Sequence, residues 1–163
     1  MRIRSFLPLI AITVLGLLDL ARYYPLLPEK VASHFDGAGL PNGWMPKDGF
    51  AVVTLILFGF AGLVQSLAAA SLRGLPDEKI NLPNKAYWLA PERRQETLGF
   101  ISDHQMRFAA ITQMLLVLVL HLVYTANLLP QPQLSSSIWI LLGGFLAVTA
   151  VWLVLLFRRF QLR

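Results

Sequence analysis

Long apolar runs alternate with polar segments along this chain. Residues 50–72 form 23 consecutive positions without a charged side chain, and residues 108–157 form 50 positions in which only His121 can carry a positive charge. A helix needs roughly 20 apolar residues to cross the hydrocarbon core of a bilayer, which is about 30 Å thick. Both runs therefore predict membrane-spanning helices, and the second run is long enough for two.

The second run is divided by a segment rich in proline and serine, which predicts a turn between spans at residues 108–129 and 138–157. A fourth, less uniform span covers residues 6–24 and ends at two tyrosines, which suit a membrane interface. Its basic start also fits a signal peptide, but no small-residue cleavage site follows, so we expect an uncleaved helix. The pattern predicts an all-helical integral membrane protein with four spans in one domain, residues 1–163.

The polar segment 25–49 contains four of the ten prolines and four of the eleven glycines, too many for one long helix. We expect it to form a small folded cap. Within it, residues 28–35 predict two helical turns that begin at Pro28, and residues 41–43 predict a tight turn.

The other long polar segment is the connection 73–107. Pro91 can begin a helix there, and Leu98, Ile101, Gln105 and Phe108 follow at spacings of three and four residues. This spacing predicts an interfacial helix that leads into the third span.

Composition agrees with lipid as the main solvent, since 56% of the residues are hydrophobic, only 14% are charged, and the mean hydropathy is +0.59. Basic residues set the expected orientation. They are concentrated in the N-terminus, the connection and the C-terminal tail: Arg2, Arg4, Arg73, Lys79, Lys85, Arg93, Arg94, Arg107, Arg158, Arg159 and Arg163. The cap holds only Lys30 and Lys47. We therefore expect the cell membrane, with both termini and the connection cytoplasmic and the cap outside. The net charge of +5 then needs no nucleic-acid partner.

The cap also carries a compact motif, a Leu-Pro pair followed by His-Phe, then Gly-Leu-Pro-Asn-Gly-Trp and a lysine. Its candidate site residues are Pro28, His34, Phe35, Asp36, Gly39, Pro41, Gly43, Trp44 and Lys47. This order resembles the membrane family catalogued as domain of unknown function 1648, over roughly the first 75 residues. Its SdpI-like relatives imply immunity to a secreted peptide toxin and tethering of a transcriptional repressor at the membrane.

A second motif lies in the connection and is similar to one in longer members of that family. Its candidate residues are Asn81, Pro83, Asn84, Lys85, Tyr87, Trp88, Pro91, Glu92, Arg93 and Arg94. The two arginines fit either a positive-inside anchor or a docking site for a partner.

Polar residues also lie within the spans: Asp19, Arg22, Gln65, Gln113 and His121. Asp19 and Arg22 are three residues apart and can form an interfacial ion pair. Alternatively, Asp19 and His121 each lie 13 residues into their spans, so they can share a layer beneath the cap. Neutral His121 could instead bond to a backbone carbonyl or Tyr124. A similar count places Gln65 beside Gln113.

Small residues mark two further faces. Gly62, Ser66 and Ala70 recur every four residues and predict an association face, which includes a homo-oligomer among the expected partners. Gly143, Gly144, Ala147 and Ala150 predict the packing side of the last span.

Three function classes remain open. The first is a noncatalytic sensor, receptor, immunity-like protein or accessory subunit that binds a peptide or protein partner through residues 25–49 and 81–97. The second is an ion- or proton-coupled transport component that uses Asp19 and His121. A membrane enzyme is the lesser alternative, because the three histidines are dispersed and no metal-binding spacing or phosphate loop occurs. We therefore expect no catalytic residue, no metal and no cofactor.

Overall fold

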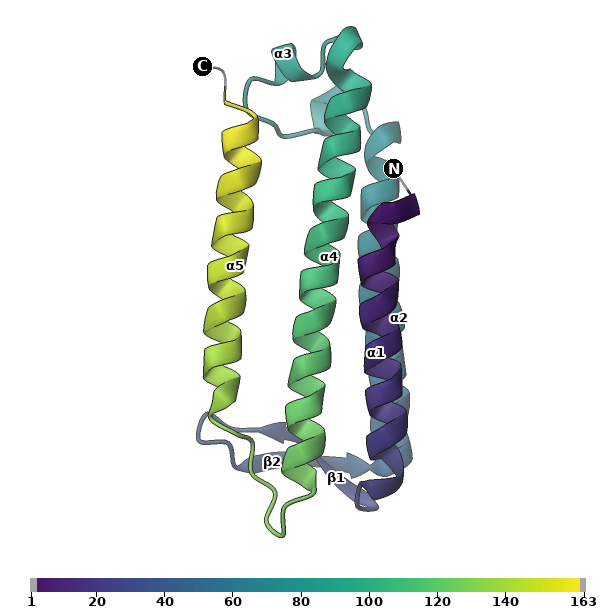
Figure 1. Ribbon diagram of the computed structural model, residues 1–163, viewed down its shortest axis with the longest axis vertical. Coiled ribbons are helices and arrows are strands. Elements are labelled where there is room, and N and C mark those ends of the chain that lie inside the picture. The colour runs from purple at the N-terminus through teal and green to yellow at the C-terminus, as the bar shows by residue number, and fades with distance from the viewer. Residues whose placement is uncertain (1–2, 162–163) are drawn as a thin grey trace.

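The computed structural model describes residues 3–161 and contains four long helices with a β-hairpin at one end (Figure 1). The helices are α1 (Leu7–Tyr23), α2 (Lys47–Ser71), α3 (Lys85–Trp88), α4 (Pro91–Asn127) and α5 (Ser137–Arg159), and the strands are β1 (Lys30–Phe35) and β2 (Pro41–Pro46). All four long helices are long and apolar enough to span a membrane. The predicted all-helical class with four spans is confirmed.

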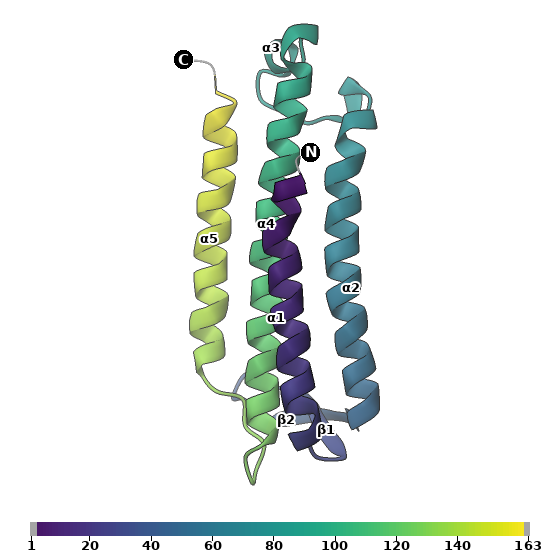
Figure 2. The same ribbon diagram turned by 45° about the vertical axis from the view of Figure 1, so that its right-hand side comes forward.

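The four long helices run alternately up and down, so the connecting segments gather at two ends (Figures 1 and 2). The hairpin and the loop between α4 and α5 form one end, which we call the hairpin end. The start of α1, the end of α5 and the segment with α3 lie at the other, which we call the connection end. The chain thus has the two-sided arrangement that a multi-pass membrane protein requires.

Helices α1, α2 and α4 pack together, and Gly16 of α1 lies against side chains of both other helices. A Cβ atom at this position would lie 2.7 Å from the Phe58 ring and 2.7 Å from a Val117 methyl group. Phe58 and Val117 belong to the main apolar core, which continues toward the hairpin through Leu120 and Tyr124. Glycine is therefore required sterically where the three helices meet.

Helix α5 packs mainly against α4, and none of its residues in the described chain is buried. The small residues of the predicted packing side are not buried in the described chain. Gly143, Gly144, Ala147 and Ala150 are all exposed. The helix is instead attached by aromatic side chains, because the Trp152 ring lies 4.5 Å from both the His104 and the Phe108 ring.

The cap differs from its prediction. Residues 30–35 form strand β1 rather than two helical turns, and residues 41–43 lie in strand β2 rather than in a tight turn. The strands pair antiparallel, with Val31 opposite Met45 and an irregularity after Ala32. The chain reverses between the strands instead, where Gly39 has φ +80°.

The connection also differs. Helix α4 begins at Pro91, as the proline position predicts, but it continues without interruption to Asn127, over 37 residues. There is thus no separate interfacial helix before the third span. The physical reason is that residues 91–107 include no glycine or proline after Pro91 except Gly99, so nothing ends the helix at the membrane surface.

Candidate functional site

The hairpin is fastened to α4 by the side chain of Asn127, which is buried. The amide oxygen of Asn127 accepts a hydrogen bond from the backbone N–H of Ala32 at 2.7 Å, and its nitrogen donates to the Ala32 carbonyl at 2.9 Å. The same nitrogen donates to the Val123 carbonyl at 2.9 Å. Asn127 therefore serves the free edge of β1 as a neighbouring strand would. Sequence reasoning missed this residue, although one amide at the end of an apolar run was the available signal.

The hairpin turn is closed by Asp36 and joined to the loop after α4. Asp36 Oδ1 accepts hydrogen bonds from the N–H groups of Ala38 and Leu40, each at 2.9 Å. The Leu134 N–H donates to the Gly39 carbonyl at 2.9 Å. A Cβ atom at position 39 would lie 2.5 Å from the Leu134 oxygen, so only glycine allows this approach. Two segments about 95 residues apart thus form one surface.

A cavity of about 580 Å³ lies between the hairpin turn and this loop. Its lining includes Phe35, Asp36, Leu129, Ser135, Ser136 and Trp139. The cavity combines aromatic and aliphatic walls with hydroxyl, carboxylate and backbone groups, and its volume is within the range of about 300–1,000 Å³ that is usual for ligand pockets. Such a lining suits a ligand with both amide and apolar groups.

The candidate cap residues divide between this cavity and the rest of the hairpin. Phe35, Asp36 and Gly39 line the cavity, whereas His34, Trp44 and Lys47 do not. Pro28, Pro41 and Gly43 likewise lie outside its lining. Lys47 forms an ion pair with Glu29 at 3.1 Å. Surface ion pairs between a lysine and a carboxylate contribute little to the free energy of unfolding.

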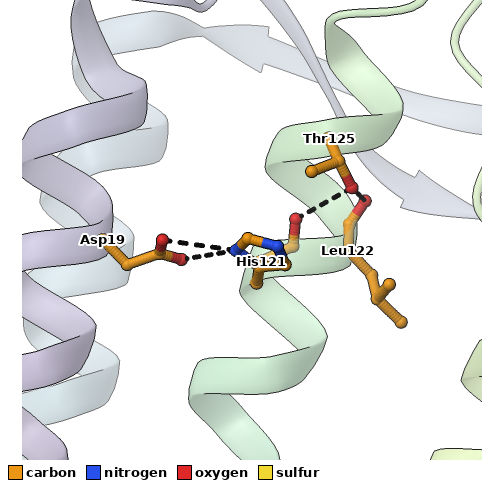
Figure 3. A network of polar contacts seen from close by, with 4 residues as sticks. All are labelled: Asp19, His121, Leu122 and Thr125. Atoms are coloured by element: carbon orange, nitrogen blue, oxygen red, sulfur yellow. Dashed lines mark hydrogen bonds and ion pairs between the residues drawn. The ribbon is translucent and has the colours of Figure 1, made fainter.

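Asp19 of α1 and His121 of α4 meet in a polar layer beneath the hairpin (Figure 3). The Nδ1 atom of His121 lies 3.0 Å from Oδ2 and 3.2 Å from Oδ1 of Asp19. The expected proximity is confirmed. Within the described residues Asp19 forms no ion pair with Arg22, which is exposed and lies 5.7 Å from the Tyr23 ring centre.

The expected pairing of Gln65 with Gln113 does not form. Gln65 accepts a hydrogen bond of 3.4 Å from Gln105, which lies about 12 Å from Gln113 along α4. Gln113 is buried, and its side-chain atoms have no hydrogen-bond partner within residues 3–161. Two side chains at equal depth make contact only if each is also directed toward the other helix.

At the connection end, the second motif encloses the C-terminal end of α5. The nitrogen of the Asn84 side chain and the Trp88 indole N–H both donate to the Phe160 carbonyl, at 2.9 and 3.0 Å. The buried Phe160 ring meets the Trp88 ring edge to face at 5.4 Å. Thr97 of α4 donates to the Trp88 carbonyl at 2.9 Å. We call this arrangement the Phe160 clasp.

Arg93 and Arg94 also contact their own chain. Arg94 donates to Asp77 at 2.9 Å and to the Leu75 carbonyl at 3.0 Å. Arg93 donates to the Tyr87 carbonyl at 3.0 Å and lies 3.9 Å from the centre of its ring. These contacts hold the connection against the start of α4. In the same motif, Asn81, Tyr87, Pro91 and Glu92 stay exposed, while Pro83 and Lys85 are half-buried.

No cluster of three or more metal-ligating side chains occurs in the described part of the chain. The architecture defines a multi-pass helical membrane protein with four spanning helices. Residues 9–60, which cover most of α1, the hairpin and about half of α2, match the family model described as Domain of unknown function (DUF1648). The resemblance of the cap motif to this family is confirmed over residues 9–60. No curated protein and no solved structure gives a significant match.

Proposed function

We propose that this protein is a noncatalytic protein of the cell membrane that binds an extracytoplasmic peptide or protein partner in the cavity at its hairpin end. The distribution of basic residues supports the orientation, because the cap holds only Lys30 and Lys47. The length of helix α4 agrees with one crossing. Arg107 lies 20 residues before Asn127, a distance of about 30 Å that matches one bilayer core. Residues 91–107 then project into the cytoplasm.

The observation that carries the proposal is the cavity itself. It is built by two segments that are distant in the sequence and are joined by the backbone hydrogen bond from Leu134 to Gly39. Its aromatic walls, Phe35 and Trp139, can hold apolar side chains, and Ser135 and Ser136 can bond to peptide amides. A peptide ligand agrees with the immunity function of SdpI-like proteins, which we extend to this chain as part of the proposal.

Two other surfaces belong to the same proposal. In residues 81–97 the exposed side chains, Asn81, Tyr87 and Glu92 among them, offer a cytoplasmic contact face beside the Phe160 clasp. At Gly62 an added Cβ atom would meet nothing within 4 Å in the described chain. Gly62 and Ser66 are half-buried and Ala70 is exposed, so we propose that this face contacts a second copy.

The experiment uses a photoreactive residue at Ser136, inside the cavity, in living cells. We expect one discrete crosslinked peptide or protein, identified by mass spectrometry. The same probe at Asn42, which lies on the hairpin outside the cavity, should not capture it. Filling the cavity by Ala38→Trp should abolish capture, because the substituted side chain occupies the partner's space.

Topology is measured in the same cells. Because the chain has no cysteine, Asn42→Cys and Lys85→Cys each introduce a single thiol. A membrane-impermeant maleimide should label the first in intact cells and the second only after permeabilisation. Recovery of lipid alone from Ser136, or the same product from both probes, would contradict the proposal.

The pair formed by Asp19 and His121 favours a second candidate, an ion- or proton-coupled transport component. Ionisable residues within a membrane mark transport pathways in many proteins. In liposomes that contain the protein, Asp19→Asn and His121→Ala should each abolish a proton-coupled flux. Absence of flux in the parent protein, or unchanged flux in both variants, would exclude this candidate.

A further inference from the structure

An apolar groove of about 550 Å³ runs between α4 and α5 and includes Ile12 of α1. A second cavity of about 310 Å³ continues from it toward the hairpin end. The two share Leu118, Ile140 and Leu141, so they form one continuous groove. We call it the α4–α5 groove. It is apolar over most of its length and ends at two polar residues, His121 and Ser137.

The groove exists because α5 is attached to α4 mainly at the connection end. There the Trp152 ring stacks on His104, and its indole N–H donates to the His104 carbonyl at 3.3 Å. Nearer the hairpin end Gly144 lines the groove, and an added Cβ atom at Gly144 would meet nothing within 4 Å in the described chain. The missing side chain therefore leaves space that the protein itself does not fill.

The groove has the dimensions of one lipid chain. It extends along α5 from Ser137 to Val148, which is about 16 Å of helix. Half of the hydrocarbon core of a bilayer is about 15 Å thick. Its polar end lies near the membrane surface on the hairpin side, and its apolar end lies near the middle of the membrane. A lipid of that leaflet likewise has a polar headgroup at the membrane surface and an apolar chain end near the middle of the membrane.

The polar end offers hydrogen-bond donors. Asp19 contacts Nδ1 of His121, and Nε2 of His121 forms no hydrogen bond among the described residues. With Nδ1 turned toward Asp19, Nε2 is the ring atom left to interact with a ligand in the groove, and it donates there whenever it carries hydrogen. The Ser137 hydroxyl is a second donor at this end. Ester and phosphate oxygens of a lipid are suitable acceptors.

We propose that the α4–α5 groove binds one acyl chain of a phospholipid from the leaflet on the hairpin side, with an ester or phosphate oxygen held by His121 and Ser137. The lipid fills space that would otherwise lack contacts and bridges α4 to α5. This site is separate from the cavity between the hairpin and the loop, so either proposal can fail without the other.

The test uses the full-length protein in phosphatidylcholine vesicles that contain a phosphatidylcholine with a photoreactive diazirine in its acyl chain. After illumination, mass spectrometry locates the labelled residues. We expect label concentrated on groove residues such as Met114, Leu118 and Leu141. Gly144→Leu should reduce this label to the level of the surrounding lipid, because the new side chain occupies the groove.

Gly143→Leu is the matched control, since Gly143 has equally open surroundings but does not line the groove. It should keep the labelling of the parent. His121→Ala should weaken retention of the probe about fivefold, the effect of losing one hydrogen bond of about 1 kcal/mol. Equal labelling of the parent and Gly144→Leu, label spread evenly over lipid-facing residues of α2, or crosslinks between two protein chains through the groove would each overturn the proposal.

Discussion

Replacement of Gly16 by leucine is expected to unfold or strongly destabilise the protein, with a loss of at least about 3 kcal/mol, the upper end of the usual cost of overpacking a core. A Cβ atom alone would lie 2.7 Å from both Phe58 and Val117, and leucine adds three further carbon atoms. Helices α1, α2 and α4 cannot keep their present separation around it. Thermal unfolding in detergent, followed by circular dichroism, measures the effect.

Gly59→Leu provides the matched control, because an added Cβ at position 59 meets nothing within 4 Å of the described chain. Its midpoint temperature should stay within a few degrees of the parent value. Combining Gly16→Leu with Phe58→Ala should recover part of the lost stability by removing one of the two clashes. If Gly16→Leu alone unfolds at the parent temperature, the close approach of the three helices is wrong.

Replacement of Asn127 by leucine is expected to release the hairpin from α4. The change removes both hydrogen bonds to Ala32 and leaves its buried N–H and carbonyl groups without their partner, at about 1–3 kcal/mol for each group. Amide hydrogen exchange in residues 30–35 should accelerate strongly, while exchange in the middle of α2 should not change. Mass spectrometry of peptic fragments measures both regions.

Two further variants define the role of Asn127. Asn127→Asp keeps an acceptor for the Ala32 N–H but loses the amide donor, so its exchange rates should lie between those of the parent and the leucine variant. Asn42→Ala, at an exposed position of β2, should behave as the parent does. Slow exchange of β1 in Asn127→Leu would show that the strand is held by other contacts.

The spanning helices were predictable because run length alone determines them. Phe50 and the 22 residues that follow have no charge, and lipid accepts no other regular backbone than a helix in a segment of this kind. Depth along the helices also placed Asp19 near His121. Both predictions depend only on distance along a helix axis, which follows directly from the number of residues.

The hairpin was not predictable by the same means. Residues 30–35 are held extended by pairing with β2 and by Asn127, which is 95 residues away from Ala32. The clasp shows the same limitation, since the partner of Asn84 and Trp88 is the carbonyl of Phe160. Local spacing carries no information about such partners, so it gave no sign of the contacts that Asn84 and Trp88 make with Phe160.

Helix α4 is also a mechanical element. Its 37 residues extend over about 55 Å, well beyond the bilayer core of about 30 Å. At one end Asn127 accepts a hydrogen bond from the hairpin, and near the other end Thr97 donates a hydrogen bond to Trp88 in the Phe160 clasp. Since no proline interrupts the helix after Pro91, it resists bending between these points. We therefore expect a tilt of the hairpin to displace the clasp at the opposite end of the helix.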